Sequence, residues 1–295
     1  MRAGVKLAAF AAVVAVIFGA AMAVGAAVGP IDVGGEAGHS MPGGVAAPME
    51  IPRGLAVAEA GYRLVVESDS VAAGSPSTFA FRIIDDNGTP ITGFQLLHER
   101  PLHLIMVSRN LVDYLHLHPT MDAEGRWSVD LPALAPGSYR VFADFQPDGA
   151  DNLTLGTDIV VPGDTRAVEI PDTSSVSAVD GYQVTLAGPP QVGDTELSFT
   201  VERDGEVVRT DPYLGAAGHL IAIRTGDLAY LHVHPHENTN TPVVTFTGEF
   251  PTAGTYRLFF DFSHNGTVHT AGFTVVVLES PAGSASTTMA SPERH

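Results

Sequence analysis

The chain repeats itself, and this duplication constrains its fold more than any other feature. The stretch "HLIMVSRNLVDYLHLHP", which begins at His103, aligns without gaps to "HLIAIRTGDLAYLHVHP", which begins at His219, with eight identities in seventeen positions. Further on, "PGSYRVFADF" from Pro136 matches "AGTYRLFFDF" from Ala253 at six of ten positions. A repeat of this length is the size of a complete small domain. The sequence therefore predicts two copies of one domain, near residues 59–163 and 179–279.

Each copy has the pattern of a β-sheet domain. Short runs such as "TFAFRII", "HLIMV" and "YRVFADF" are rich in branched and aromatic residues and are bounded by Gly, Pro, Asn or Asp. About seven or eight such strands per copy predict a Greek-key β-sandwich, either immunoglobulin-like or cupredoxin-like. A repeated Gly-x-Tyr, at Tyr139 and Tyr256, resembles the tyrosine corner of these sandwiches. The expected fold class is all-β, with two tandem sandwiches after an N-terminal transmembrane helix.

The N-terminus indicates export. Arg2 and Lys6 precede 25 uncharged residues, Leu7 to Ile31, a run long enough for a membrane-spanning helix. The basic flank should stay in the cytoplasm, which makes the chain a single-pass membrane protein with its domains outside the cell. The alternative is a cleaved signal peptide and secretion, because "AMA" at residues 21–23 has the small-x-small form of a cleavage site.

Segments of low complexity surround the two domains. Residues 32–58 are rich in Gly, Pro and Ala and predict a flexible tether between the first 31 residues and the first domain. Residues 164–178 are the predicted linker between the domains, and residues 280–295 are a predicted disordered tail. The candidate chemistry therefore lies within the repeats.

Composition excludes several classes of function. The formal net charge of −18 opposes binding to nucleic acid or anionic lipid headgroups and is compatible with a cation as ligand. The absence of cysteine excludes disulfides, thiolate metal sites and cysteine nucleophiles. The acids nearest the repeated histidines, Glu99 and Asp113, have no matching acid in the second copy. The sequence therefore predicts a protein that is not an enzyme.

The repeated "YLH(L/V)HP" motif holds the candidate ligands. His116 and His118 are one residue apart on a strand, so their side chains point to one face, about 7 Å apart. His103 begins the preceding strand. A hairpin loop with an even number of residues places His103 opposite His118 on that same face. The sequence therefore predicts that the three rings converge.

The second copy repeats this arrangement. A two-residue type II′ turn at Gly226-Asp227 pairs His219 with His234 and brings both beside His232. Three imidazoles on one patch form an open site suited to copper, with zinc as the alternative. We expect one metal site per domain, with these ligands: His103, His116 and His118 in the first domain, and His219, His232 and His234 in the second.

Further residues are candidates for a fourth ligand. Met121 offers a thioether in the first copy, and His236 and His264 lie in loops of the second. His98 stands alone and is interpreted as structural or solvated. With the ordinary histidine pKa near 6.5, protons should compete with the metal between about pH 7 and 5. A reading without metal stays open, in which the histidines cap strand ends through main-chain carbonyls.

The histidine motif resembles that of a group of bacterial membrane-anchored or secreted proteins described as heavy-metal-binding. Their hallmark is an "HLH(L/V)HP"-like strand after an "HL(I/V)" strand, and the likeness covers both β domains. The matching residues are His103, His116, His118 and Pro119, and then His219, His232, His234 and Pro235. The resemblance implies an extracytoplasmic protein that binds a metal, here copper, for buffering, tolerance or delivery. The alternative is a structural or interaction module built from immunoglobulin-like domains.

Overall fold

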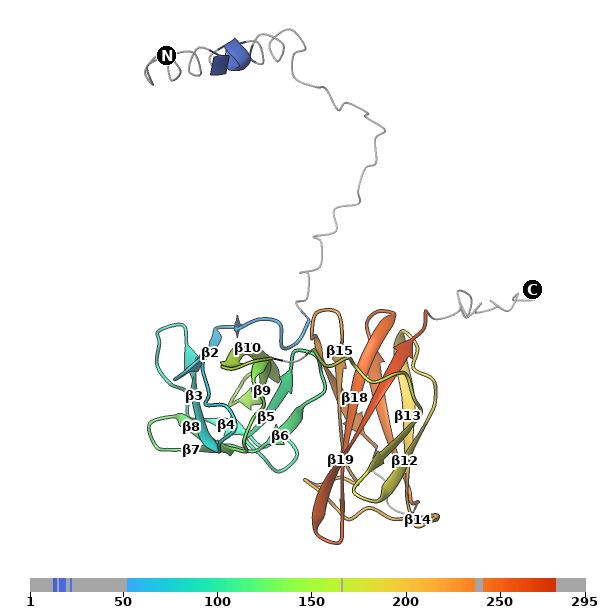
Figure 1. Ribbon diagram of the computed structural model, residues 1–295. Helices are drawn as coiled ribbons and strands as arrows, with labels where there is room; N and C mark the ends of the chain where they lie inside the picture. The colour runs from blue at the N-terminus through green and yellow to red at the C-terminus, as the bar shows by residue number, and fades with distance from the viewer. Residues whose placement is uncertain are drawn as a thin grey trace, which may run out of the picture. The chain divides into compact units, whose positions relative to one another are not determined.

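A computed structural model describes residues 13–14, 16–19, 22, 52–165, 167–236 and 241–279 (Figure 1). The side chains of His232 and His234 are outside this description. Among the described residues, no helix is long and apolar enough to cross a membrane. Most of the predicted membrane segment, most of the predicted tether and the predicted tail lie outside the described residues and stay predictions.

The first domain is a sandwich of two antiparallel sheets, coloured blue to yellow-green in Figure 1. One sheet has the order β1-β2-β3-β8-β7, and the other has the order β10-β9-β5-β6, with β4 paired to β9. The strands are β1 (Ala58–Glu59), β2 (Tyr62–Val66), β3 (Ser77–Asp85), β4 (Phe94–Gln95), β5 (Leu102–Ser108), β6 (Tyr114–Leu117), β7 (Thr120–Met121), β8 (Arg126–Leu131), β9 (Gly137–Pro147) and β10 (Leu153–Val161).

The second domain, coloured yellow to red, repeats this arrangement with one strand passing between the sheets. Its order is β11-β12-β13-β17-β16-β15-β18-β19, with β14 paired to β13. Strand β16 pairs first with β15 and then with β17, whereas the first domain divides the corresponding segment into β6 and β7. The strands are β11 (Val176–Val179), β12 (Tyr182–Ala187), β13 (Gly193–Arg203), β14 (Glu206–Val208), β15 (His219–Arg224), β16 (Tyr230–Pro235), β17 (Val243–Phe250), β18 (Gly254–His264) and β19 (Thr267–Val277).

The strand order in each domain is that of an immunoglobulin-like sandwich. Strands β2, β3 and β8 take the places of A, B and E, and strands β5, β6, β9 and β10 take those of C, C′, F and G. Both expected tyrosine corners are present. The Tyr139 hydroxyl donates to Ala135 O at 3.0 Å, and the Tyr256 hydroxyl donates to Thr252 O at 2.9 Å. The all-β prediction is confirmed.

Strand β5 differs from the other strands in being buried along its whole length. In β12, by contrast, Tyr182, Val184 and Leu186 are buried while the residues between them are not, as expected when one face covers a core. All seven residues of β5 are buried. A strand buried on both faces needs a second apolar layer.

That second layer comes from the other domain. A cluster separate from the two domain cores contains Ile105, Val107, Leu111, Phe142, Ile221, Ile223, Leu228, Tyr230 and Phe259. Tyr114 packs against it and stacks on Phe259, with ring centroids 4.2 Å apart. Arg257 Nε donates to Leu111 O at 3.1 Å. We call this contact between the two domains the junction.

The described end of the predicted tether belongs to the folded unit. Gly54 N–H donates to Thr154 O at 2.8 Å, and Tyr230 N–H donates to Arg53 O at 3.0 Å. Residues 52–58 therefore contact both domains, which corrects their assignment to a flexible segment. Gly54 has a φ of +74°, a conformation that a residue without a Cβ adopts without strain.

Candidate metal centre

The hairpins place the histidines on the backbone in the predicted register. In the first copy Ile105 pairs with His116, which sets His103 opposite His118. In the second copy Ile221 pairs with His232 and Ile223 with Tyr230, which is the predicted register. Beyond His232, β16 pairs with β17, and the backbone of His234 lies opposite Thr247. Because opposed residues of an antiparallel pair share a face, the predicted register is confirmed over the residues that pair.

The loop that closes the second hairpin is different from the one expected. Leu228, not Gly226, adopts a left-handed φ, of 64°, whereas a type II′ turn at Gly226-Asp227 requires positive φ at the glycine. That turn assignment is therefore wrong. Arg224 N–H donates to Ala229 O at 3.0 Å, which leaves four residues in the loop. Four is an even number, so the histidines keep their common face.

His103, His116 and His118, here called the triad, converge in the first domain. One nitrogen of each ring lies within 4.8 Å of a nitrogen of the other two. The ring centroids are 5.2 Å apart for His103 and His116, 5.1 Å for His103 and His118, and 4.9 Å for His116 and His118. Imidazoles bonded at about 2.0 Å to one tetrahedral ion have centroids roughly 5 Å apart. The triad has the spacing of a three-histidine metal site.

Two triad rings have their outer nitrogen held by a protein acceptor. His103 Nε2 donates to Leu97 O at 2.9 Å. His116 Nδ1 lies 2.8 Å from Asp261 Oδ2, a carboxylate supplied by β18 of the second domain. Histidine ligands of metals commonly hold their second nitrogen on a carbonyl or carboxylate in this way, which leaves the first nitrogen for the ion.

Proton counting shows that the inner contact between these two rings needs either an added proton or a bound metal ion. His103 Nδ1 and His116 Nε2 lie 2.9 Å apart. A neutral imidazole carries one proton, which His103 uses at Leu97 O and His116 uses at Asp261. The two inner nitrogens then present only lone pairs to each other. An added proton or a bound metal ion removes this repulsion.

The third ring of the triad also presents an unpaired nitrogen. His118 Nε2 is buried and has no hydrogen-bond partner among the described residues. A buried polar atom without a partner costs about 1–3 kcal/mol and is uncommon in native structures. One nitrogen of the His118 ring lies within 4.8 Å of a nitrogen of each of the other two rings, so this ring can supply a third donor for one ion.

Burial keeps two rings of the triad in the form that binds metal. Burial, followed by repulsion from the neighbouring imidazoles, lowers the pKa of His103 to about 4 and that of His118 to about 3. These rings are therefore neutral at pH 7, as ligands must be. Proton competition at His103 and His118 moves below the range of pH 7 to 5 that an ordinary histidine predicts.

Two more histidines lie beside the triad. The ring centroid of His219, from the second domain, is 6.2 Å from that of His103 and 6.1 Å from that of His116. The His98 ring is 5.0 Å from the His219 ring. His98, His103, His116 and His219 line a cavity of about 20 Å³ together with Asp144 and other residues. His219 is thus next to the first-copy ligands, whereas the sequence assigns it to a separate second-domain site.

The three extra ligand candidates lie elsewhere. Met121 packs against the core of the first domain. His236 is exposed, with Nε2 2.6 Å from Thr247 Oγ1, and His264 Nδ1 lies 2.7 Å from the Tyr182 hydroxyl. Their described contacts give no support to ligation by these residues at the triad.

Sequence reasoning missed Asp261 and interpreted His98 as structural or solvated. A signal for Asp261 was present, because "FADF" and "FFDF" place Asp144 and Asp261 at the same position of the repeat, among aromatic residues. Both are buried, at 3% and 1% exposure. A buried carboxylate needs a partner, and its recurrence next to a histidine motif points to that partner. His98 gave no such signal, since the second copy has Leu214 at the corresponding turn position.

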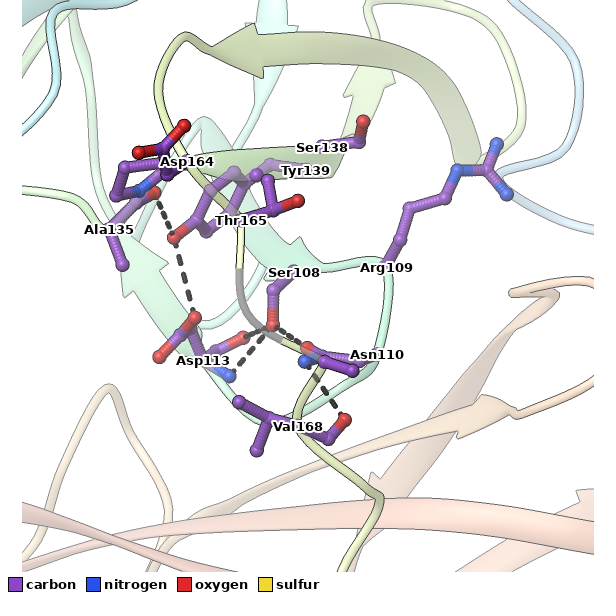
Figure 2. Close-up of a pocket in the computed structure, with 13 residues that line it drawn as sticks. Ser108, Arg109, Asn110, Asp113, Ala135, Ser138, Tyr139, Asp164, Thr165 and Val168 are labelled. Atoms are coloured by element: carbon purple, nitrogen blue, oxygen red, sulfur yellow. Dashed lines mark hydrogen bonds between the residues drawn. The ribbon is translucent and has the colours of Figure 1, made fainter.

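A larger cleft of about 620 Å³ lies beside the tyrosine corner of the first domain (Figure 2). The Tyr139 hydroxyl there lies 3.0 Å from Ala135 O and 3.3 Å from Asp113 Oδ2. Burial raises the pKa of Tyr139 to about 12, so the phenol stays protonated. Ser108 Oγ donates to Asn110 Oδ1 at 2.6 Å. These polar groups hold the corner and its loop together, which is a structural role.

The fold and the cluster define a protein made of two tandem immunoglobulin-like β-sandwiches with histidines gathered at their junction. The chain belongs to the family described as Domain of unknown function (DUF8832), which matches residues 56–158 and again residues 177–279. The double match confirms the tandem repeat. No curated protein matches the chain.

Solved structures similar to the chain include an adhesin and a surface layer protein. The Escherichia coli adhesin FdeC is 18% identical with a TM-score of 0.25, covering 77% of this chain and 66% of that one. Yersinia pseudotuberculosis InvD is 17% identical with a TM-score of 0.25, covering 79% and 61%. The surface layer protein SbsC, domains 4–9, is 15% identical with a TM-score of 0.23, covering 74% and 31%. The chain spans less than two thirds of each of these structures, and TM-scores this low support no conclusion about function.

Proposed function

We propose that the protein binds a transition metal ion at the junction of its two β domains, outside the cytoplasm. The observation that carries the proposal is the 2.9 Å contact between His103 Nδ1 and His116 Nε2, whose outer nitrogens are already held by Leu97 O and Asp261 Oδ2. Two facing lone pairs need a cation. The unpartnered, buried Nε2 of His118 supplies the third donor.

The donor set favours copper, with zinc as the alternative. Imidazole nitrogens suit both ions, and divalent copper binds such ligands more tightly than zinc does. The net charge of −18 favours the approach of a cation. The proposed role is buffering, tolerance or delivery of the metal by a binding protein that is not an enzyme.

The uncharged run Leu7 to Ile31 supports the extracytoplasmic location. The positive-inside tendency places the β domains outside when this run is a membrane anchor. Cleavage after the "AMA" sequence would instead release the protein as a secreted one.

A second candidate function is that of a structural or interaction module without metal. The apolar junction favours it, because the stacked rings of Tyr114 and Phe259 already join the domains. In this reading His116 carries the extra proton and pairs with Asp261, and the neutral rings of His103 and His118 serve as packing. The two candidate functions differ in what lies between His103 Nδ1 and His116 Nε2, a metal ion in the first and a proton in the second. A metal titration therefore distinguishes them.

Calorimetric titration of untagged, chelator-treated protein with Cu(II) tests the proposal. The wild-type chain should bind saturably near neutral pH, and His103→Ala should weaken binding at least about tenfold, since a ligand is lost. The matched control is Leu117→Ala. Leu117 packs against the core of the first domain, so its loss should lower stability by about 2 kcal/mol and leave the affinity unchanged.

Two outcomes would contradict the metal proposal. A wild-type chain that binds neither Cu(II) nor Zn(II) would leave the structural module as the function. Wild-type affinity in His103→Ala, together with lost binding in Leu117→Ala, would mean that the ligands lie on the other face of β6.

A further inference from the structure

We propose that His219 completes the coordination of the ion held by the triad, so that both domains bind one shared ion. The inference rests on the proposed function. It replaces one site per domain by a single site across the junction, and it gives the ion a second role as a cross-link between the domains.

The ring spacings place His219 next to the triad. The His219 centroid lies 6.2 Å from that of His103 and 6.1 Å from that of His116. Rings bound at about 2.0 Å to one tetrahedral ion have centroids roughly 5 Å apart, as the triad rings do. The His219 nitrogens are not among those that lie within 4.8 Å of one another, so ligation requires the His219 ring to move toward the triad when the ion binds.

The His219 ring is held in the same way as its counterpart in the first copy. His219 Nε2 donates to Tyr213 O at 3.0 Å, as His103 Nε2 donates to Leu97 O at 2.9 Å. The carbonyl fixes the proton on Nε2 and leaves Nδ1 with a lone pair. The His219 residue is 6% exposed, so its ring belongs to the buried histidine cluster.

A strained turn brings His98 to the same place. His98 and Glu99 have φ values of 47° and 64° and form the centre of a turn closed by hydrogen bonds between Leu97 and Arg100. Such a turn favours Asn-Gly, and two ordinary residues in left-handed conformations store strain. The second copy has Leu214 followed by a glycine at its turn.

The strained turn sets the His98 ring against His219. The two rings meet edge to face, with centroids 5.0 Å apart and planes at 80°. We assign His98 as a positioning residue that fixes the orientation of His219. The second copy supplies the natural control, since leucine occupies that turn position without disturbing the turn.

Native mass spectrometry, calorimetry and electron paramagnetic resonance of the Cu(II)-loaded full chain test the shared site. The wild-type chain should bind one ion. His219→Ala should weaken binding about tenfold or more and remove nitrogen hyperfine coupling from the spectrum. His98→Leu should retain the fold and shift the spectrum with a smaller loss of affinity. His264→Ala, which removes a second-domain histidine that contacts Tyr182, should leave affinity and spectrum unchanged.

The possible results distinguish failure of the shared site from failure of the proposed metal site at the triad. A His219→Ala chain with wild-type affinity and spectrum would overturn the shared site and leave the triad standing. So would a wild-type chain that binds two ions, one of which is lost in His232→Ala with His234→Ala. A wild-type chain that binds no ion, or a His116→Ala chain with His118→Ala that binds as wild type, would overturn the metal site itself.

Discussion

An Asp261→Ala chain should lose about 3 kcal/mol of unfolding free energy and bind copper at least about tenfold more weakly. The Asp261 carboxylate accepts hydrogen bonds from the hydroxyls of Tyr114 at 3.1 Å and Thr270 at 2.5 Å, and it lies 2.8 Å from His116 Nδ1. It is 1% exposed, so water does not replace it. Its loss removes the partner of three part-buried groups and frees the His116 ring to turn. Urea unfolding and copper titration measure the two effects separately.

Two control variants sharpen this result. Asp261→Asn keeps the volume and one acceptor oxygen, so it should fall between wild type and Asp261→Ala in both measurements. Asp130→Ala removes an exposed carboxylate that accepts a hydrogen bond from Thr78 Oγ1 at 2.9 Å, and such a bond contributes about 1 kcal/mol. Equal stability and equal affinity for Asp261→Ala and Asp130→Ala would contradict a role for Asp261 at the junction.

Acid should destabilise the metal-free protein as the pH falls from about 6.5 to about 4. Burial lowers the pKa of His103 to about 4 and those of His118 and His219 to about 3, with repulsion from His116 as the next cause. The unfolded chain takes up protons on these residues near pH 6.5. Between these pH values the unfolded chain binds protons on these histidines and the folded chain does not. The free energy of unfolding is therefore highest above about pH 6.5 and decreases as the pH falls to the folded-state pKa. For His103 alone the loss amounts to about 3 kcal/mol.

Urea unfolding at intervals between pH 7 and 4, in the presence of chelator, measures this loss. A His103→Gln chain has no titrating group at that position and should lose less stability with acid than wild type. His264→Gln is the matched histidine control and should follow the wild-type profile. If the His103→Gln profile has the wild-type slope, burial of His103 is not a source of the acid sensitivity.

The hairpin geometry could be predicted from the sequence because it follows from short-range rules. Strand alternation puts His116 and His118 on one face, and any loop with an even number of residues adds His103. The type of loop could not be predicted. Gly226 is the residue with the easiest access to positive φ, yet Leu228 adopts it, because the hairpin packs this leucine into the junction.

The junction itself could not be derived from local patterns. The run "LHLIMVS" of β5 is buried along its length and is consistent with apolar contacts on both faces. The run does not indicate which part of the chain covers its second face. The approach of His219 and Asp261 to the triad depends on how two complete domains pack. That information is spread over the whole contact rather than carried by one motif.

X-ray absorption at the copper edge of the loaded protein tests the central claim most directly, because it reports the atoms bound to the ion. The account predicts a first shell of nitrogen at about 2.0 Å with the multiple scattering of at least three imidazoles. In the chain with both His116→Ala and His118→Ala, this imidazole signal should be lost. A first shell dominated by oxygen in the wild-type protein, or an imidazole signal unchanged by the double substitution, would contradict a metal site at the triad.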